Sequence, residues 1–124
     1  MPSARPTTYK GIRMRSRLEA MFAQRLDTDG PIGMVSWAYE PDCYASPQGQ
    51  YLPDFRMDFA DDAPIFVEVK PPSADPLEAL SRMHVILASE PEADLAVYVS
   101  DGGYPSPTWR VAASCRPDAP RSEE

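Results

Sequence analysis

The chain has 124 residues, with 12 Lys or Arg and 19 Asp or Glu, which gives a formal net charge of −7 at pH 7. This length predicts a single domain over residues 1–124, and a hydrophobic content of 43% is typical of a soluble globular protein. The sequence has no run of 18 apolar residues and no apolar signal-peptide core at its N-terminus, so we expect no membrane span and a cytoplasmic location.

Cysteine and histidine are scarce, which narrows the possible chemistry. Cys43 and Cys115 are the only cysteines and His84 is the only histidine. We expect both cysteines to be free thiols, because paired cysteines belong mainly to secreted chains. The lack of a Cys/His cluster argues against a zinc site and against a Ser–His triad.

Charge is unevenly distributed along the chain. Residues 1–26 contain six basic residues and one acidic residue, a net charge of +5, whereas the remainder contains six basic and 18 acidic residues, a net charge of −12. A basic segment can contact phosphates, or it can be the solvated face of a helix. The candidate DNA-contacting side chains are Lys10, Arg13, Arg15 and Arg17.

A flexible segment and then a helix are predicted first. Residues 1–10 contain two Pro and small polar residues, so we expect them to be disordered. A helix is predicted from about residue 15 to 27. Glu19 lies only about 20° around this helix from Leu26, at the rim of the buried face, where a carboxylate needs a partner or a metal. The apolar stripe consists of Leu18, Met21, Phe22 and Leu26.

Three strands are predicted next, at residues 34–39, 51–59 and 65–70. Residues 41–50 contain two Pro, a Gly and an Asp, which favours a loop between the first two strands. The turn at residues 60–63 is short, so the second and third strands should form an antiparallel hairpin.

The register of this hairpin brings two carboxylates together. If Asp58 pairs with Pro64, then Asp54 lies opposite Glu68, with Cβ atoms about 4.5–5.5 Å apart. Glu68 and Lys70 project from the same face of their strand, because side chains alternate. Carboxylates this close repel each other unless something such as a divalent cation neutralises them. A slip of one residue would break this arrangement.

A second helix is predicted at residues 75–89, followed by a buried strand at 94–99 and a short strand at 109–113. The helix should begin at Asp75, because Asp75-Pro76-Leu77-Glu78 combines a capping residue with Pro at the first helical position. The tail at 116–124 is expected to be flexible. The apolar stripe of the second helix is predicted to be Leu77, Leu80, His84 and Leu87.

The predicted order of helix, three strands, helix and strand indicates an α/β fold with a central mixed sheet flanked by helices. Asp54, Glu68 and the Val69 carbonyl offer the hard oxygen ligands that Mg²⁺ or Mn²⁺ prefers. A metal held there can activate water, and Lys70 can orient that water or stabilise negative charge. Glu19 can complete the coordination directly or through water. The residues therefore predict a site that hydrolyses phosphodiesters.

Glu19, Pro53-Asp54 and Glu68-Val69-Lys70 resemble the motif of the PD-(D/E)xK nuclease superfamily. The resemblance implies a restriction-endonuclease-like core of order αβββαβ over about residues 15–100. Segments 9–20, 37–41, 51–55 and 68–71 are also similar to small nucleases of this superfamily from bacteriophages and actinobacteria. Asp54 and Glu68 would then be metal ligands, Lys70 the water-positioning cation and Glu19 the helical acid, in a deoxyribonuclease of a bacterial host cell, possibly encoded by a phage.

Other functions stay open from the sequence. The net charge of −12 beyond residue 26 favours a non-catalytic protein of the same fold that binds DNA or another protein, and a nuclease acting on RNA lacks a supporting aromatic platform. Taken singly, Glu68 and Lys70 can be a surface ion pair, Asp54 a turn former and Glu19 a surface helix residue. The chain is short for this fold, so we expect a homodimer or a partner subunit.

Overall fold

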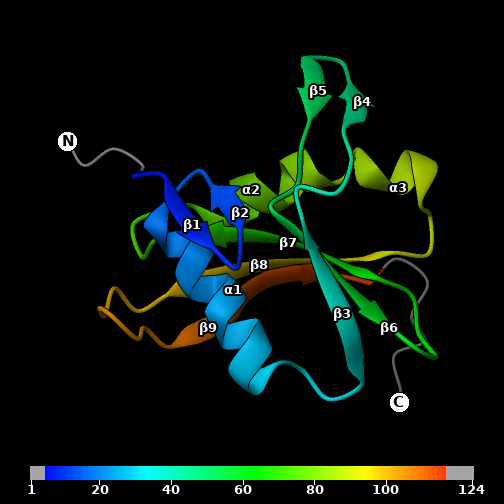
Figure 1. Cartoon of the computed structure of the whole chain (residues 1–124). Helices are drawn as coiled ribbons and strands as arrows, with labels where there is room; N and C mark the ends of the chain where they lie inside the picture. Colours follow the sequence, from blue (N-terminus) through cyan, green and yellow to red (C-terminus); the bar gives the residue numbers. More distant parts are fainter. Residues whose placement is uncertain (1–4, 117–124) are drawn as a thin grey trace.

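The computed structural model describes residues 5–116, which form a mixed α/β fold (Figure 1). Its central sheet has five strands in the order β3-β6-β7-β8-β9. Only the β7–β8 pair is parallel, and the other neighbours are antiparallel. The predicted α/β class with a mixed sheet is therefore confirmed. The five strands are β3 (Met34–Tyr39), β6 (Phe55–Phe59), β7 (Ile65–Lys70), β8 (Asp94–Ser100) and β9 (Trp109–Cys115).

Helix α1 (Arg17–Asp29) covers one face of the sheet (Figure 1). The hydroxyl of Ser16 accepts a hydrogen bond from the backbone N–H of Glu19 at 3.1 Å, which satisfies one of the free donors at the start of the helix. Phe22 is buried, and its ring centroid lies 5.2 Å from that of Phe55. This packing fixes α1 against the sheet with Glu19 in its first turn. The rest of this core includes Ala23, Leu26, Met57, Val67 and Val69.

Helices α2 (Pro76–Met83) and α3 (Ile86–Ser89) pack on the opposite face of the sheet. The predicted start of α2 is confirmed, because Oδ1 of Asp75 accepts hydrogen bonds from the backbone N–H groups of Leu77 and Glu78. The sheet is therefore the middle layer of three, and successive side chains along its strands face the two helical layers in turn.

The predicted apolar stripe of the second helix is only half right. The helix ends at Met83 and a separate turn, α3, follows it, so the continuous helix expected over residues 75–89 does not form. The side chain of Leu77 is 69% exposed, and His84 is exposed too, whereas Leu80 and Leu87 are partly buried and pack against the core as predicted. The shorter helix also turns residues outside the predicted stripe toward the sheet. Its buried apolar side chains, with that of α3, are Ala79, Met83 and Ile86.

A small hairpin precedes α1, where the sequence predicted disorder. Strands β1 (Thr7–Tyr9) and β2 (Ile12–Met14) pair antiparallel. The turn between them is Lys10-Gly11, with φ of 50° and 80°, and glycine adopts such angles without steric cost. The prediction of disorder over residues 1–10 is therefore wrong for residues 7–9. The expected flexible ends at 1–4 and 117–124 lie outside the described residues.

A second hairpin replaces the predicted loop at residues 41–50. Strands β4 (Tyr44–Ser46) and β5 (Gly49–Tyr51) pair antiparallel and extend away from the main sheet (Figure 1). The buried ring of Tyr44 stacks edge-on against Phe66, which ties the base of this hairpin to the core. The arrangement brings Tyr51 next to the end of β7, as described below.

The predicted register of the β6–β7 hairpin is confirmed. Phe55 pairs with Val67, and Met57 pairs with Ile65. Extending this register by one residue sets Asp54 opposite Glu68, as expected. The strand predicted from residue 51 begins only at Phe55, because Pro53 has no N–H to donate to a neighbouring strand.

Two further findings concern the cysteines and the helices. Cys43 and Cys115 are free, as expected. Among residues 5–116, no helix combines the length and the apolar character needed to cross a membrane.

Candidate active site

Asp54 lies at the point where β6 and β7 separate. Its side chain is buried, and Oδ2 accepts a hydrogen bond from the backbone N–H of Val69 at 2.8 Å. The β6–β7 ladder has ended before this position, so the carboxylate satisfies a strand donor that has no backbone partner there. Oδ1 of Asp54 lies 3.3 Å from a terminal nitrogen of Arg15. Both oxygens of this buried acid therefore have specific partners.

Glu68 lies on β7 and is also buried, with only 6% of its surface exposed. The hydroxyl of Tyr51, from the β5 hairpin, donates a short hydrogen bond to Oε2. Oε1 lies 3.8 Å from Nζ of Lys70, two residues along the strand. The Lys70 side chain is 25% exposed, so it is partly accessible to solvent.

Glu19 approaches the same region from α1. Oε1 accepts a hydrogen bond from the Tyr39 hydroxyl at 2.7 Å, and this hydroxyl accepts one from the backbone N–H of Arg15 at 2.9 Å. Tyr39 is the last residue of β3, so the chain of contacts ties the first turn of α1 to the edge of the sheet. Glu19 is buried, as its place beside the apolar stripe predicts.

Arg15 and Glu40 complete the cluster. Nε of Arg15 lies 2.5 Å from Oε2 of Glu40, and a terminal nitrogen lies 3.8 Å from Oε2 of Glu19. Glu40 has a φ of 46°, a left-handed backbone conformation that costs a residue other than glycine about 1–3 kcal/mol. Its backbone N–H donates to the Asp54 carbonyl at 2.8 Å, which holds this conformation in place.

The buried carboxyl groups of Asp54 and Glu68 have raised pKa values. Burial, followed by the charges of Glu68 and Glu19, raises the pKa of Asp54 well above its usual value. Burial also raises the pKa of Glu68, although the Tyr51 hydrogen bond and the positive charges of Lys70, Arg82 and Arg15 act in the opposite direction. Strongly perturbed acids beside a cation are typical of functional sites.

The oxygen atoms at this site are of the type that hard divalent cations prefer, but the acidic side chains are not grouped as a metal would need. Asp54 and Glu68 offer carboxylate oxygens, and Val69, whose carbonyl was the third predicted ligand, lies between Glu68 and Lys70 on β7. However, no three Asp, Glu, His or Cys side chains within residues 5–116 are grouped closely enough to hold a metal as they stand. The Arg15 guanidinium already contacts Asp54 and Glu19. A metal would therefore share these acids with Arg15 or displace it.

The predicted DNA-contacting residues have different environments. Nζ of Lys10 pairs with Asp27 at 3.1 Å, and the guanidinium of Arg17 lies 4.5 Å from the centroid of the Tyr104 ring. Arg13 is exposed on β2. Arg15 is turned into the acidic cluster, where its guanidinium contacts Glu40 and Asp54. The basic segment therefore does not act as one uniform surface.

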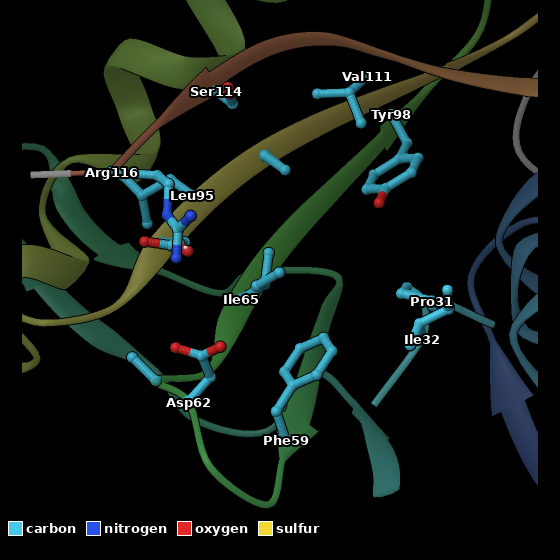
Figure 2. Close-up of a pocket in the computed structure, with 13 residues that line it drawn as sticks. Pro31, Ile32, Phe59, Asp62, Ile65, Leu95, Tyr98, Val111, Ser114 and Arg116 are labelled. Atoms are coloured by element: carbon cyan, nitrogen blue, oxygen red, sulfur yellow. Dashed lines mark ion pairs between the residues drawn. The ribbon is translucent and has the colours of Figure 1, made fainter. Parts of the chain in front are cut away.

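A pocket lined mainly by apolar side chains lies elsewhere on the sheet. It has a volume of about 390 Å³ and is lined in part by Phe59, Ile65 and Tyr98, whose side chains gather around it in Figure 2. Arg116 closes one side and pairs with Asp94 at 2.9 Å. Ile65 begins β7, and Glu68 lies three residues farther along, about 10 Å away on an extended strand. Glu19, Asp54 and Glu68 do not line the pocket, so it is separate from the buried acids.

Sequence reasoning assigned no role to Tyr39, Glu40 or Tyr51. These residues lie in or beside segments whose likeness to small nucleases was noted, Trp37 to Pro41 and Tyr51 to Phe55. The hydroxyl groups of the two tyrosines each donate to one buried carboxylate. The positions of these tyrosines depend on β3 and on the unpredicted β4–β5 hairpin, so similarity was detectable in the sequence but the contacts were not.

No family model matches this sequence, and no curated protein or solved structure is significantly similar to it. The geometry of the site therefore carries the functional argument.

Proposed function

We propose that the protein is a divalent-metal-dependent deoxyribonuclease that hydrolyses DNA phosphodiester bonds. The observation that carries the proposal is the burial of Asp54 beside Glu68, with Lys70 on the same strand and Glu19 nearby. Burying neighbouring carboxylates costs free energy, and apolar residues would fill the same space more favourably. A set of acids kept at this cost is better explained by chemistry than by packing.

Asp54, Glu68 and the Val69 carbonyl would hold Mg²⁺ or Mn²⁺, which supplies an activated water for attack on phosphorus. Lys70, with Nζ 3.8 Å from Glu68, orients the attacking water and stabilises the charge that develops on the phosphate as the ester P–O bond breaks. Tyr51 fixes the orientation of Glu68, and Tyr39 fixes that of Glu19.

DNA contact is proposed for the exposed basic residues that precede and begin α1. Arg13 and Arg17 are exposed, whereas Lys10 pairs with Asp27, which lies near the C-terminal end of α1. Arg15 lies between this basic group and the buried acids, since its side chain is 60% exposed while its guanidinium contacts Asp54. A phosphate bound by these side chains would lie beside the acidic cluster, where cleavage is proposed.

A second candidate function is a non-catalytic protein that binds DNA or another protein, or a nuclease subunit that needs a partner. The net charge of −12 beyond residue 26 favours its protein-binding form, because an acidic surface would repel a DNA backbone. The absence, within residues 5–116, of a ready group of three metal-binding side chains also favours it. A homodimer, a partner subunit and a cytoplasmic location remain predictions.

Cleavage of a panel of labelled DNAs tests the proposal. Supercoiled, linear, single-stranded, flapped and four-way-junction DNAs are incubated with EDTA, Mg²⁺ or Mn²⁺. Lys70→Ala removes the proposed cation, and Arg110→Ala is the matched control because Arg110 is an exposed basic residue on β9. Metal-dependent cutting by the wild type and Arg110→Ala, but not by Lys70→Ala, supports the nuclease.

Two other outcomes would change the interpretation. Equal cutting by Lys70→Ala and the wild type would remove Lys70 from the mechanism and point to a contaminating nuclease. An absence of cutting by a folded wild type that binds Mn²⁺ in calorimetry would favour the binding protein or the dependent subunit.

A further inference from the structure

Four carboxylates and two cations meet in the acidic cluster, and their formal charges do not balance. The acids are Glu19, Glu40, Asp54 and Glu68, which carry −4, and the contacting cations are Arg15 and Lys70, which carry +2. The remaining formal charge is −2, equal and opposite to that of one divalent cation. Arg82, which also acts on Glu68, is already paired with Glu78 at 3.0 Å.

The contacts of Arg15 are unequal. Its Nε lies 2.5 Å from Glu40, whereas the terminal nitrogen lies 3.3 Å from Asp54 and 3.8 Å from Glu19. Glu40 is thus the close partner, and the two proposed site acids are the more distant ones. A cation bound by Asp54 and Glu19 would compete only with the two longer contacts, while the contact with Glu40 could persist.

The state of Glu40 indicates that it serves mainly this guanidinium. Its buried Oε2 makes no hydrogen bond with any residue that the structure describes, so its contact with Arg15 is ionic rather than directional. Glu40 follows the last residue of β3 and has a left-handed backbone, and its side chain extends to Arg15. Glu40 has a strained backbone, and its buried Oε2 contacts only one charged group. Both features are more consistent with a functional role than with a packing role.

We infer that Arg15 is an exchangeable counter-ion of the site, which occupies the negative cluster until a divalent cation binds, and that Glu40 is the positioning residue that retains its guanidinium. This inference rests on the proposed metal-dependent function. It adds a regulatory element, because the affinity for metal is then set by competition with a charge of the chain itself. Binding of a phosphate by Arg15 would draw the guanidinium outward and favour metal binding.

Mn²⁺ binding, measured by calorimetry or by loss of the free-ion spin-resonance signal, tests the inference without an activity assay. Arg15→Gln removes the competing charge, and we expect the affinity for Mn²⁺ to rise about tenfold at low salt. Arg110→Gln is the matched control, since it removes the same charge from an exposed residue on β9 without an assigned role, and it should change the affinity by less than about twofold. Arg15→Lys, which keeps the charge, should stay close to the wild type.

Glu40→Gln supplies the second arm of the test. Loss of this anchor releases the guanidinium to Asp54 and Glu19, so the affinity for Mn²⁺ should fall. The factor by which Glu40→Gln lowers the affinity for Mn²⁺ should be at least about three times larger in the wild type than in the Arg15→Gln variant, which has no guanidinium to release. An equal fall in both backgrounds would overturn the role of Glu40.

The outcomes separate this inference from the proposed function. Binding by the wild type that Arg15→Gln leaves unchanged or weakens would overturn the inference alone, since a purely structural arginine predicts that result. An absence of binding by both proteins would overturn the inference and the metal site together. Metal binding that follows the predicted order, without cleavage of any DNA, would support the exchange and contradict only the nuclease.

Discussion

The two ends of α1 carry acidic centres of opposite character. Near the C-terminal end, Asp27 accepts hydrogen bonds from the Tyr9 hydroxyl at 2.7 Å and from Trp37 Nε1 at 2.8 Å, and it pairs with Lys10. Partial burial acts in the opposite direction, but these three donors together lower the pKa of Asp27. At the N-terminal end, burial and neighbouring acids raise the pKa of Asp54.

The difference lies in the ratio of donors to acids. Asp27 is one carboxylate with three donors, so its ionised form stabilises the fold even in the last turn of a helix, where the dipole disfavours negative charge. Around Asp54, several carboxylates share too few cations. The first centre is what stability alone would select, and the second fits the proposed metal site, which would keep its acids at a cost in stability.

Asp54→Asn should give the largest functional change and the clearest test of this contrast. We expect DNA cleavage to fall at least about a hundredfold, because a proposed metal ligand is lost. In EDTA, the same variant should have an unfolding free energy that is equal to the wild-type value or about 1 kcal/mol higher, since one repelling charge is gone. Urea unfolding measures the second quantity, and a clear loss of stability would place Asp54 among the structural acids.

Asp27→Ala should show the reverse pattern. Loss of the shared acceptor should lower the unfolding free energy by about 1–2 kcal/mol, because Tyr9 and Trp37 lose their common partner at a partly exposed site. Cleavage should be unchanged once the protein is folded. Asp29→Ala is the control, because Asp29 is an exposed acid of the same helix turn and its ion pair with Arg25 should contribute less than about 0.5 kcal/mol. Equal losses in both variants would show that Asp27 is an ordinary surface acid.

The sequence was informative where local patterns and register decide the structure. The bounds of β3 and β7 were predicted correctly, because dense β-branched and aromatic runs end at turn residues. The pairing that sets Asp54 opposite Glu68 followed from the short turn after Phe59. Glu19 was placed correctly beside the buried stripe of α1 from helical periodicity alone.

Tertiary contacts decided the features that the sequence missed. The β4–β5 hairpin has few apolar residues, and Tyr44 is held by Phe66 across the fold, so no local pattern predicts it. The same holds for β1, whose Tyr9 is held by Asp27. Arg15 looked like one more solvated arginine, because only the folded chain brings Glu40 next to it. Contacts of this kind join segments distant in sequence and leave no periodic signal.

The pH dependence of stability should sharpen the contrast for Asp27. Its folded pKa is lower than the ordinary value of 3.8, so its contribution is complete above that value and is lost as the pH falls through the folded pKa. The difference in unfolding free energy between the wild type and Asp27→Asn should therefore be constant from pH 7 to about pH 5 and should shrink below about pH 4. A difference that grows on acidification would mean that the folded pKa is raised.

Lys10→Ala should have the smallest effect and would divide the Asp27 centre into its parts. The ammonium group lies 3.1 Å from Asp27, but the Lys10 side chain is 65% exposed, so water and salt screen the pair. We expect a loss of no more than about 0.5 kcal/mol, which 1 M NaCl should abolish, whereas Tyr9→Phe should cost about 1 kcal/mol and be insensitive to salt. Paired urea titrations at low and high salt measure both quantities. If Lys10→Ala cost as much as Tyr9→Phe, charge rather than directed hydrogen bonding would stabilise Asp27. The centres around Asp27 and Asp54 would then differ only in the number of cations that neutralise their acids.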